Sequence, residues 1–445
     1  MIKYIQKLSI PQMIVVTYAL LITFGSLLLW LPISSASGEW TSLVDALFTA
    51  TSATAVTGQI TLTTATHWNL FGKTVILLLI QIGGLGFMTI WMLFYYNLAG
   101  RRPNLKQRRA ASESLSLSGG DSVQQKVWSI IRFSLTVQAI GAVLLAVSFL
   151  PEYGGLQGIY FSVFHSISAF NNAGFDLIGN SLVTYQENPY VLLVFSGLIM
   201  AGGLGFIVWE DLLNYKNSKE LRKYSKIVLV TTVSLWVIGT LLFWLAESQN
   251  TAFSDLSIID QLTNSFFLSV TPRTAGFSNL EYGSLSQGSV FLTILLMFIG
   301  ATSASTGGGI KVTTLAVILI VIYRHLSNRP PIVLSRKVAE DTIRRAFFIF
   351  SVGIMLIGLA TFILLITEDI PPNYGVEYVL MEVVSCISTV GLTMGLTPNL
   401  SIIGKFILIF LMLVGRVGVM TFLWSIAGEK RESRLNYPEM NILIG

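Results

Sequence analysis

Four short segments of the chain each place a glycine beside small or hydroxyl-bearing residues, a pattern suited to backbone that binds a cation. The glycines are Gly58, Gly174, Gly276 and Gly391. Glycine adopts positive φ without a side-chain clash, so the chain can turn back at these points with its carbonyl oxygens facing one axis. Rings of backbone carbonyls can replace the hydration shell of potassium. These residue types therefore predict carbonyl chemistry directed at a cation.

Three residues from each segment are the candidate ion-binding residues. They are Val56, Thr57 and Gly58; Asn172, Ala173 and Gly174; Thr274, Ala275 and Gly276; and Thr389, Val390 and Gly391. The glycines are 116, 102 and 115 residues apart, so the segments recur at nearly equal spacing. A single loop glycine usually marks only a turn, but four copies in register indicate an internal repeat.

The elements around each glycine follow one order. A long apolar stretch is followed by an external turn with an acidic residue, a half-length apolar stretch that ends near the glycine, a polar return and a second apolar stretch. Half-length stretches such as 43–56, 159–172 and 376–389 cannot cross a hydrocarbon core of about 30 Å. We interpret them as re-entrant helices, which are tolerated at membrane depth where they line a wet cavity. Their C-terminal carbonyls carry partial negative charge, which favours a cation.

Composition supports a chain embedded in a membrane. Of the 445 residues, 53% are hydrophobic and 11% are charged, and the mean hydropathy is +0.70. The stretches 13–31, 75–98 and 227–245 are apolar and long enough to span a bilayer. The sequence predicts an all-α integral membrane fold of four helix–pore-loop–helix repeats around a pseudo-fourfold axis. The predicted repeats cover 8–100, 126–215, 226–325 and 344–428, followed by a cytoplasmic tail at 429–445.

The basic residues lie in short loops between the apolar stretches. The net charge of +5 does not indicate nucleic acid, because these clusters alternate with loops that carry acids and few bases. By the positive-inside rule, the basic loops and both termini are predicted to be cytoplasmic. The clusters are Lys3 and Lys7, 101–109, 216–226, 324–345 and 430–434. The first apolar stretch does not resemble a removable signal peptide, and the single cysteine, Cys386, excludes an intrachain disulfide.

A second glycine motif follows three of the four glycine segments. It reads Gly-Gly-Leu-Gly from Gly83 and from Gly202, and Gly-Arg-Val-Gly from Gly415, at offsets of 25, 28 and 24 residues. We expect these glycines to lie within spanning helices and to allow close helix packing. No strand precedes them, so they do not form a dinucleotide fingerprint.

The third repeat differs from the others at this point. An apolar stretch meets a polar, glycine-rich tract that would destabilise a helix, since each glycine costs about 1 kcal/mol relative to alanine. The tract is a candidate gate beneath the glycine ring, and the alternative is a flexible kink that serves helix packing. Its residues are Gly300, Ala301, Thr302, Ser303, Ala304, Ser305, Thr306, Gly307, Gly308 and Gly309.

Arg416 stands in the fourth repeat where the first two repeats have Gly84 and Gly203. An arginine within a spanning helix normally faces the bundle interior or a wet cavity. We expect Arg416 to point toward the pore and to bond the serine- and threonine-rich tract as part of the gate. The alternative is that its side chain reaches out to the cytoplasmic surface. For Lys311, anchoring at the interface and gating both remain open.

At these residues the chain resembles the Trk/Ktr/HKT superfamily of cation transporters, and this resemblance covers essentially the entire chain. It implies a potassium-channel-like fold of four repeats. Glycine at all four filter positions is the pattern associated there with potassium, whereas serine at the first position is associated with sodium. The chain is most similar to the B-type membrane subunits of bacterial Ktr potassium uptake systems, because its first repeat begins near Met13 without two additional helices.

The resemblance also implies properties that composition and spacing do not show. These are a location in the bacterial plasma membrane, a homodimer with one pore per subunit, stimulation by sodium, and control by a cytosolic ring of nucleotide-binding RCK-type subunits. No cofactor is expected on this chain itself; potassium is the substrate, and nucleotide acts through the regulatory partner. Channel-like conduction and coupled symport both remain open.

Two other classes of function are less consistent with the sequence. His67, His165 and His325 fall in an external turn, a pore helix and a cytoplasmic loop, so an enzyme site built from them is not expected. A secondary transporter with inverted repeats also uses broken helices. Four repeats of the same orientation favour a channel-like axis instead. A Trk-like or sodium-permeable transporter remains the nearest alternative.

Overall fold

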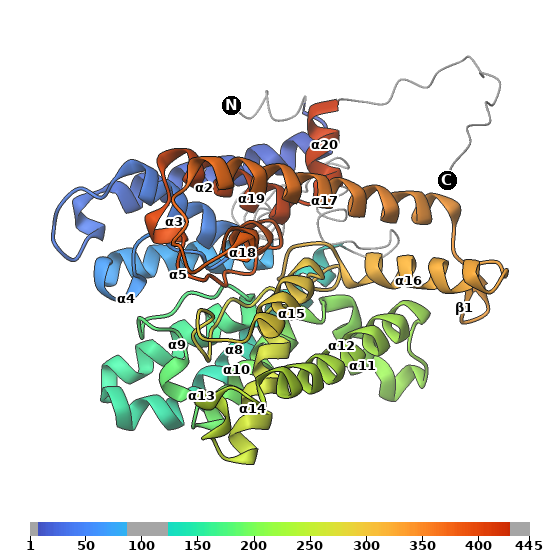
Figure 1. The fold of residues 1–445 in the computed structure, drawn as a ribbon, viewed down its shortest axis with the longest axis horizontal. Helices are drawn as coiled ribbons and strands as arrows, with labels where there is room; N and C mark the ends of the chain where they lie inside the picture. Colours follow the sequence, from blue (N-terminus) through green and yellow to red (C-terminus); the bar gives the residue numbers. More distant parts are fainter. Residues whose placement is uncertain (1–7, 87–122, 428–445) are drawn as a thin grey trace.

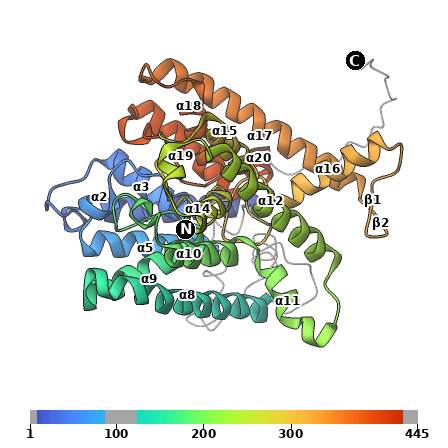
Figure 2. The same cartoon turned by 60° about the horizontal axis from the view of Figure 1, so that its bottom comes forward.

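The computed structural model describes residues 8–86 and 123–427 of the chain, and nearly all of its regular elements are helices (Figure 1). A hairpin of β1 (Ile332–Val333) and β2 (Arg336–Lys337) lies at the outer end of α16 (Val312–Leu326) and α17 (Glu340–Thr367) (Figure 2). Within the described residues, four helices are long and apolar enough to cross a membrane. They are α2 (Ile10–Trp30), α8 (Val123–Tyr153), α12 (Lys223–Glu247) and α17 (Glu340–Thr367).

The outward faces of these long helices are apolar. Val143 on α8, Val230 on α12 and Phe362 on α17 are each more than 60% exposed. Continuous exposed apolar faces of this extent are unusual on a water-soluble monomer, whereas a lipid-facing surface requires them. The predicted spans at 13–31 and 227–245 correspond to α2 and α12.

Each long helix is followed by a shorter helix that ends near one of the four glycines. These pore helices are α3 (Leu43–Ala55), α9 (Gly155–Asn171), α14 (Ile258–Val270) and α18 (Val376–Ile387). The chain then returns to a second helix, which begins with a side-chain cap from Asn69, Asn188, Ser286 or Ser401. These second helices are α5 (Leu70–Leu85), α10 (Pro189–Gly203), α15 (Gln287–Phe298) and α19 (Ile402–Val417).

In the third and in the fourth repeat, a buried acidic side chain connects the end of the long first helix to the start of the second helix. Glu247, at the end of α12, accepts hydrogen bonds from the Ser286 backbone N–H (3.0 Å) and hydroxyl (2.8 Å). Glu368, just after α17, accepts the same two bonds from Ser401 (2.7 and 2.6 Å). An ionised acceptor at a helix N-terminus is stabilising, so these acids hold each second helix against the end of the first.

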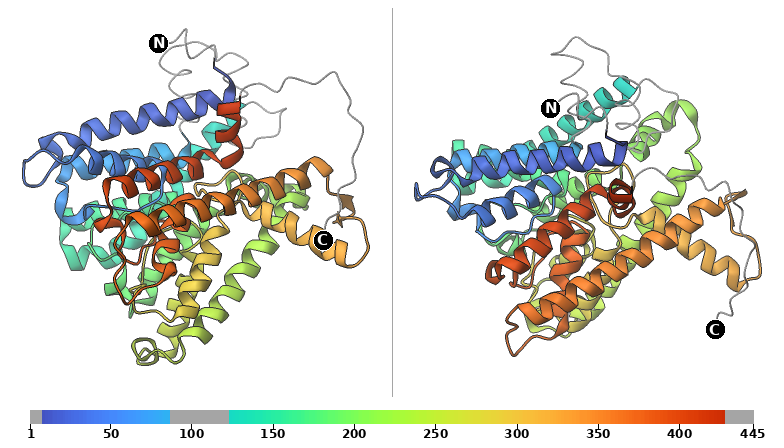
Figure 3. Two further views of the ribbon diagram at one scale, coloured as in Figure 1. Left: turned by 45° about the horizontal axis from the view of Figure 1, so that its top comes forward. Right: turned by 90° about the horizontal axis from the view of Figure 1, so that it is seen from above.

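The four repeats pack around one centre in cyclic order. Each pore helix lies between the two helices of its own repeat and also contacts the second helix of the preceding repeat. The pairs between repeats are α3 with α19, α9 with α5, α14 with α10, and α18 with α15. In the views of Figure 3, the blue first repeat and the orange to red fourth repeat lie side by side. This packing gives four walls around a common axis.

The second helices of the second and fourth repeats do not continue straight across the membrane, so the expectation that their glycine motifs lie within spanning helices was wrong. The axes of α10 and α11 (Phe206–Ser218) meet at 97°, and those of α19 and α20 (Val419–Ala427) at 99°. The break falls at Gly205 and Gly418, whose φ angles are +84° and +92°. Positive φ ends a helix and suits glycine. Gly86, at the end of α5, has φ +81° as well.

The glycine-rich interruption is therefore not confined to the third repeat. There it is longer, because residues 299–311 separate α15 from α16 (Val312–Leu326). Several predicted features lie outside the described residues. These are Lys3 and Lys7, the end of the first repeat at 87–100, the basic clusters at 101–109 and 430–434, and the tail at 429–445.

Candidate ion-binding site

The four glycine segments meet in a closed ring. A Cβ atom at any of the four glycines would collide with, or lie in tight contact with, a backbone carbonyl oxygen of the next repeat. The contacts run from Gly58 to Ala173, from Gly174 to Ala275, from Gly276 to Val390 and from Gly391 to Thr57. The order follows the chain through all four repeats and returns to the first. The structure thus brings together the twelve residues singled out from the sequence.

The backbone of the ring alternates in handedness. All four glycines have positive φ, from +69° to +96°. The residue two positions earlier also has positive φ in every segment: Val56 (+58°), Asn172 (+61°), Thr274 (+77°) and Thr389 (+50°). The residue between these two positions does not have positive φ in any of the four segments. Left-handed and other conformations in alternation allow successive carbonyl groups to point to the same side of the chain.

Positive φ at these earlier positions is strained, since three of the residues are β-branched and such residues rarely adopt it. Strained backbone persists only where the surrounding structure imposes it, and it clusters at functional sites. Sequence reasoning placed the left-handed residues at the glycines and missed these four. The local sequence carries no signal for them, because their side chains disfavour the conformation that they hold.

A hydroxyl residue at the end of each pore helix holds the ring from behind. Ser52 accepts hydrogen bonds from Thr57 N at its carbonyl (2.8 Å) and from Gly58 N at its hydroxyl (3.1 Å). Ser385 accepts the matching pair from Val390 N (2.8 Å) and Gly391 N (2.9 Å). Because backbone N–H groups are used on this side, the carbonyls remain available on the other.

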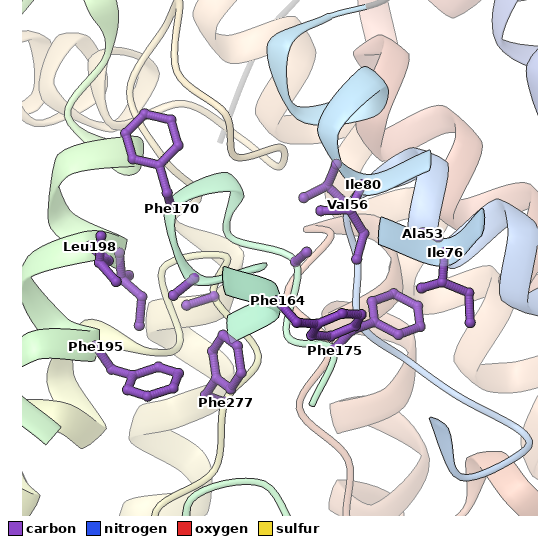
Figure 4. Close-up of a cluster of buried hydrophobic side chains, with 14 of the residues drawn as sticks. Ala53, Val56, Ile76, Ile80, Phe164, Phe170, Phe175, Phe195, Leu198 and Phe277 are labelled. Atoms are coloured by element: carbon purple, nitrogen blue, oxygen red, sulfur yellow. The ribbon is translucent and has the colours of Figure 1, made fainter. Parts of the chain in front are cut away.

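In the second and third repeats a hydroxyl residue stands at the same place, but its hydroxyl donates a hydrogen bond and does not accept one. Ser168 and Thr271 donate their hydroxyls to the carbonyls of Phe175 (2.8 Å) and Phe277 (2.5 Å), just beyond the ring glycines. These two phenylalanines are buried, and the Phe277 ring lies 5.0 Å from that of Phe195, so apolar packing surrounds the ring (Figure 4). The signal for the hydroxyl residues, a serine or threonine five or six positions before each glycine, was present in the sequence but was not used.

The helix-motif glycines pack against the pore helices, as expected. A Cβ atom at Gly83, Gly202 or Gly415 would collide with the carbonyl oxygen of Thr54, Phe170 or Ile387. Each of these carbonyls belongs to the last turn of a pore helix. Close approach therefore explains why a side chain is absent at these three positions.

The tract at 300–309 folds into a compact loop that lies against the ring. Gly300 N donates to Ile310 O (2.7 Å), so the two ends of the loop meet. Near the C-terminal end of the loop, Gly307 and Gly308 have no room for a Cβ atom, because the side chains of Thr274 and Thr389 fill that space. The loop thus contacts the third and fourth segments of the ring directly.

Threonines of the loop bond the second repeat. Thr302 bonds Gly203 O through its backbone N–H (3.2 Å) and its hydroxyl (3.0 Å). Thr306 donates its backbone N–H to Gly202 O (3.3 Å) and its hydroxyl to Phe170 O (3.2 Å). These bonds give the loop a defined place, which a merely flexible kink would lack.

Two basic side chains, those of Arg416 and Lys311, bind the loop from the other side. Arg416 donates Nη1 to Thr306 O and Nη2 to the carbonyls of Gly83 and Gly84. Its side chain therefore points inward and joins the loop to the first repeat, rather than reaching toward the surface. Lys311 donates Nζ to Gly307 O (2.8 Å) and Gly308 O (3.2 Å). Both basic side chains thus bind backbone carbonyl groups of the loop.

A polar network behind the ring joins the fourth repeat to the first. The Glu382 carboxylate, fully buried on α18, accepts hydrogen bonds from Gln59, from the Thr393 hydroxyl, from Thr397 Oγ1 (2.7 Å) and from Met394 N (3.2 Å). Gln59 directly follows a ring glycine. Sequence analysis missed this network, because an isolated acid in an apolar stretch does not reveal a partner 323 positions away.

We expect Glu382→Ala to lower the free energy of unfolding by roughly 2–4 kcal/mol, because several buried donors would lose their shared acceptor at once. Thermal unfolding of the detergent-solubilised protein measures the effect. Glu377→Ala is the matched control, since Glu377 is only half-buried on the same helix and accepts one bond from Gly375 N (2.8 Å). Equal unfolding temperatures for the two variants would show that the network does not stabilise the ring.

The three histidines lie apart from the ring backbone. His67 is at the end of α4 (Thr64–His67), with Nε2 3.1 Å from Thr41 Oγ1. His165 is buried on α9, where Nδ1 lies 2.7 Å from Phe161 O and Nε2 accepts from Leu177 N (3.2 Å). His325 is in the last turn of α16. The contacts of His165 are those of a structural residue that holds the external end of the second segment.

The family model and the relatives that match this chain are all described as cation transport or uptake proteins. A family model described as "TrkH: Cation transport protein" matches residues 3–432. A protein of Enterococcus hirae named "Potassium/sodium uptake protein NtpJ" is 44% identical over 443 residues, covering 99% of this chain and 98% of the relative. A Bacillus subtilis protein named "Ktr system potassium uptake protein B" is 40% identical over 437 residues, covering 98% and 96%.

A solved structure has the same fold. The crystal structure of the potassium transporter TrkH from Vibrio parahaemolyticus aligns with a TM-score of 0.71 over 92% of this chain and 83% of that one, at 18% identity. This likeness confirms the predicted fold class, an all-α membrane protein of pore-loop repeats.

Proposed function

Because the chain belongs to the TrkH family of cation transport proteins, we propose that it conducts potassium into a bacterial cell as the membrane subunit of a Ktr-type uptake system. The observation that carries this proposal is the closed ring of four glycine segments with alternating backbone handedness. Relatives at 44% and 40% identity carry potassium uptake in their names. The resulting protein is a multi-pass membrane protein with one pathway in each chain.

The ring supplies the selectivity filter. Carbonyl oxygens of the twelve ring residues replace the water around a potassium ion as it enters between the pore helices. The four helix C-termini direct their partial negative charge to the same place and stabilise the dehydrated cation. The hydroxyl residues behind the ring hold the backbone in this arrangement, so the spacing of the carbonyls does not relax around a smaller ion.

The loop at 300–309 and Arg416 act as the gate. The loop lies against the ring, and Arg416 joins it to the first repeat through carbonyl oxygens. A guanidinium presents five donors and keeps its charge, so the pair satisfies each other while the charge opposes a cation. Conduction follows when the loop withdraws from the axis.

A sodium-permeable transporter is the second candidate, and one observation favours it: the Enterococcus hirae relative is named for both potassium and sodium. The first ring position decides between the two. Gly58 leaves the carbonyl ring symmetric with the other three repeats, which favours potassium. Sodium then acts as an activator of uptake rather than as the main cargo.

Control by other subunits completes the proposal. Relatives are named as parts of a Ktr system, and we place a cytosolic RCK-type ring, which binds the nucleotide, on the cytoplasmic face of a homodimer. Both termini lie on that face. The ring contacts the basic clusters, of which 216–226 and 324–345 lie within the described residues. The described residues at 324–345 include the exposed hairpin of β1 and β2 at the end of α16.

Charge reversal on this hairpin should weaken the regulatory complex. We expect Arg336→Glu to reduce binding of the purified regulatory ring about tenfold, because rim charges steer and orient such contacts. Light scattering on the purified complex reports both binding and the dimer. Glu39→Lys, an exposed charge change before α3, is the control. A monomeric membrane subunit that shows nucleotide control without a partner contradicts this assignment.

Growth at low potassium tests the function in cells. A bacterial strain without its own potassium uptake systems should grow in submillimolar potassium when it expresses this chain together with a Ktr regulatory subunit. The empty vector is the control. Rescue by sodium addition alone, without potassium accumulation in the cells, would reject potassium as the cargo.

A further inference from the structure

The junction between the fourth and the first repeat differs from the other three junctions around the ring. Each of the first three repeats continues along the chain into the next one, whereas the fourth meets the first only through non-covalent contacts. At this junction Gly391 packs against the backbone of Thr57 and Gly58, with no room for a Cβ atom. The contacts that hold the two segments together here therefore help to set the size of the ring.

The residue directly after each ring glycine also differs at this junction. In three repeats this residue is apolar and buried: Phe175, Phe277 and Leu392. In the first repeat it is Gln59, whose side chain is fully buried and crosses to the fourth repeat. Burial of an amide is costly unless it is hydrogen-bonded, so a polar residue at this place indicates a role beyond packing.

The amide group of Gln59 is fully bonded to the fourth repeat. Its Nε2 donates to Glu382 Oε2 and to Thr397 Oγ1 (2.9 Å). Its carbonyl oxygen accepts a hydrogen bond from the Cys386 thiol (2.9 Å). Glu382 and Cys386 lie on the pore helix α18, so one side chain of the first repeat is held by the helix that ends at the fourth segment.

Glu382 is also bonded at both oxygens. Oε1 accepts from the Thr393 hydroxyl and from Met394 N (3.2 Å), and Oε2 accepts from Gln59 and from the Thr397 hydroxyl (2.7 Å). A buried polar network in which every member is satisfied is rigid and specifies one arrangement of its elements. The network thus gives the first segment a defined place relative to α18.

An ion pair lies on the same junction. Lys405 Nζ of α19 is 2.7 Å from Asp45 Oδ1 of α3, and both side chains are mostly buried. The junction is therefore held at two places, by this ion pair and by the bonds between Gln59 and Glu382. A ring that relaxed inward at one junction would coordinate the smaller sodium ion as well as potassium.

We propose that Gln59 and Glu382 are positioning residues for the first and fourth segments of the filter and determine part of its preference for potassium over sodium. Neither side chain binds the ion. Their hydrogen bond holds the carbonyl groups of Thr57 and Gly58 in place beside Gly391, so the junction does not close around a smaller cation.

Glu382→Gln tests the pair, and the transport arm of the test rests on the proposed potassium uptake. The variant keeps the shape of the side chain, but one oxygen becomes an amino group that faces two hydrogen-bond donors. The ratio of potassium to sodium uptake in liposomes should fall about tenfold, the effect of losing about one buried hydrogen bond. Gln59→Met keeps the length of the side chain without its polar atoms and should act in the same direction. Glu377→Gln, on the same helix but only half-buried, is the matched control.

Exchange of the two residues separates positioning from stability. In the double variant Gln59→Glu with Glu382→Gln, the new carboxyl group accepts from the new amide group, so the bond across the junction forms again with donor and acceptor reversed. The uptake ratio should return toward that of the wild type. Thermal unfolding of the purified protein in potassium and in sodium gives a readout without transport, because a bound ion stabilises the folded state. The gain in potassium over sodium should shrink in Glu382→Gln and recover in the double variant.

The outcomes are distinct. A wild-type uptake ratio in both Glu382→Gln and Gln59→Met overturns the proposal, even if their unfolding temperatures fall, because the pair is then purely structural. A double variant whose loss equals the sum of the two single losses also overturns it, since the residues then act separately. Wild-type protein that takes up no potassium instead rejects the proposed cargo, and the unfolding temperatures in the two ions still test the pair.

Discussion

Gly58→Ser should lower the preference for potassium over sodium about tenfold or more. At φ +90° a serine is strained, and its Cβ atom would collide with the carbonyl oxygen of Ala173. A left-handed conformation costs an L-residue about 1–2 kcal/mol, and the collision displaces backbone rather than a flexible side chain. Because a difference of about 1.4 kcal/mol changes an equilibrium tenfold, distortion at one ring position is enough to alter selectivity.

The same substitution at Gly197 provides the control. Gly197 lies on α10, is exposed and has no atom within 4 Å of a would-be Cβ. Uptake of potassium and sodium by reconstituted protein, measured with each ion alone and in competition, gives the ratio for both variants. If Gly58→Ser transports the two ions in the wild-type ratio, the first segment is not part of the filter.

Arg416→Ala should raise potassium flux about tenfold or more and reduce its dependence on the regulatory partner. The substitution removes the bonds to Thr306, Gly83 and Gly84. Each hydrogen bond to a charged group contributes about 1.5–3 kcal/mol, so the closed arrangement loses enough to shift the population of the gate. Shortening the loop at 303–305 should act in the same direction. Selectivity should not change, because the ring contacts are untouched.

Two further variants separate charge from anchoring. Arg416→Lys keeps the charge but cannot bridge the loop and the first repeat with a planar fork, so it should give an intermediate flux. Arg132→Ala removes an arginine that is exposed on α8 and lies outside the basic clusters, so it should behave as wild type. If Arg416→Ala and the shortened loop both fold normally and leave flux and regulation unchanged, the loop is a packing element and the gate lies elsewhere.

The positions of the ring glycines could be predicted because the pattern repeats. Each of Gly58, Gly174, Gly276 and Gly391 follows a half-length apolar stretch, and only glycine tolerates the required φ without strain. The fold class follows from the same repetition, together with hydropathy. A single segment would have carried neither conclusion.

The kinks in the second helices of the second and fourth repeats could not be predicted from the sequence. The motifs that end at Gly205 and Gly418 were recognised in the sequence, but a glycine that packs closely and a glycine that ends a helix look alike there. In the structure the first glycine of each motif packs against a pore helix and the last one has positive φ. The two roles become separate only when the neighbouring helix is in place.

The partners of Glu382 and Arg273 could not be predicted at all. Glu382 bonds Gln59 from the opposite end of the chain, and Arg273 meets Trp236 only because α12 and α14 pack together. Periodicity and propensity describe neighbours along one helix. They carry no information about which helices meet around a closed ring.

The central claim, that this ring conducts potassium selectively, is tested most directly by ion flux in liposomes that contain only the purified chain and its regulatory subunit. With a potassium gradient and a potassium ionophore as the reference, we expect saturable potassium uptake that far exceeds sodium uptake at equal concentration and is stimulated by added sodium. Equal uptake of both ions, or no flux above that of empty liposomes while the protein remains folded, would contradict it.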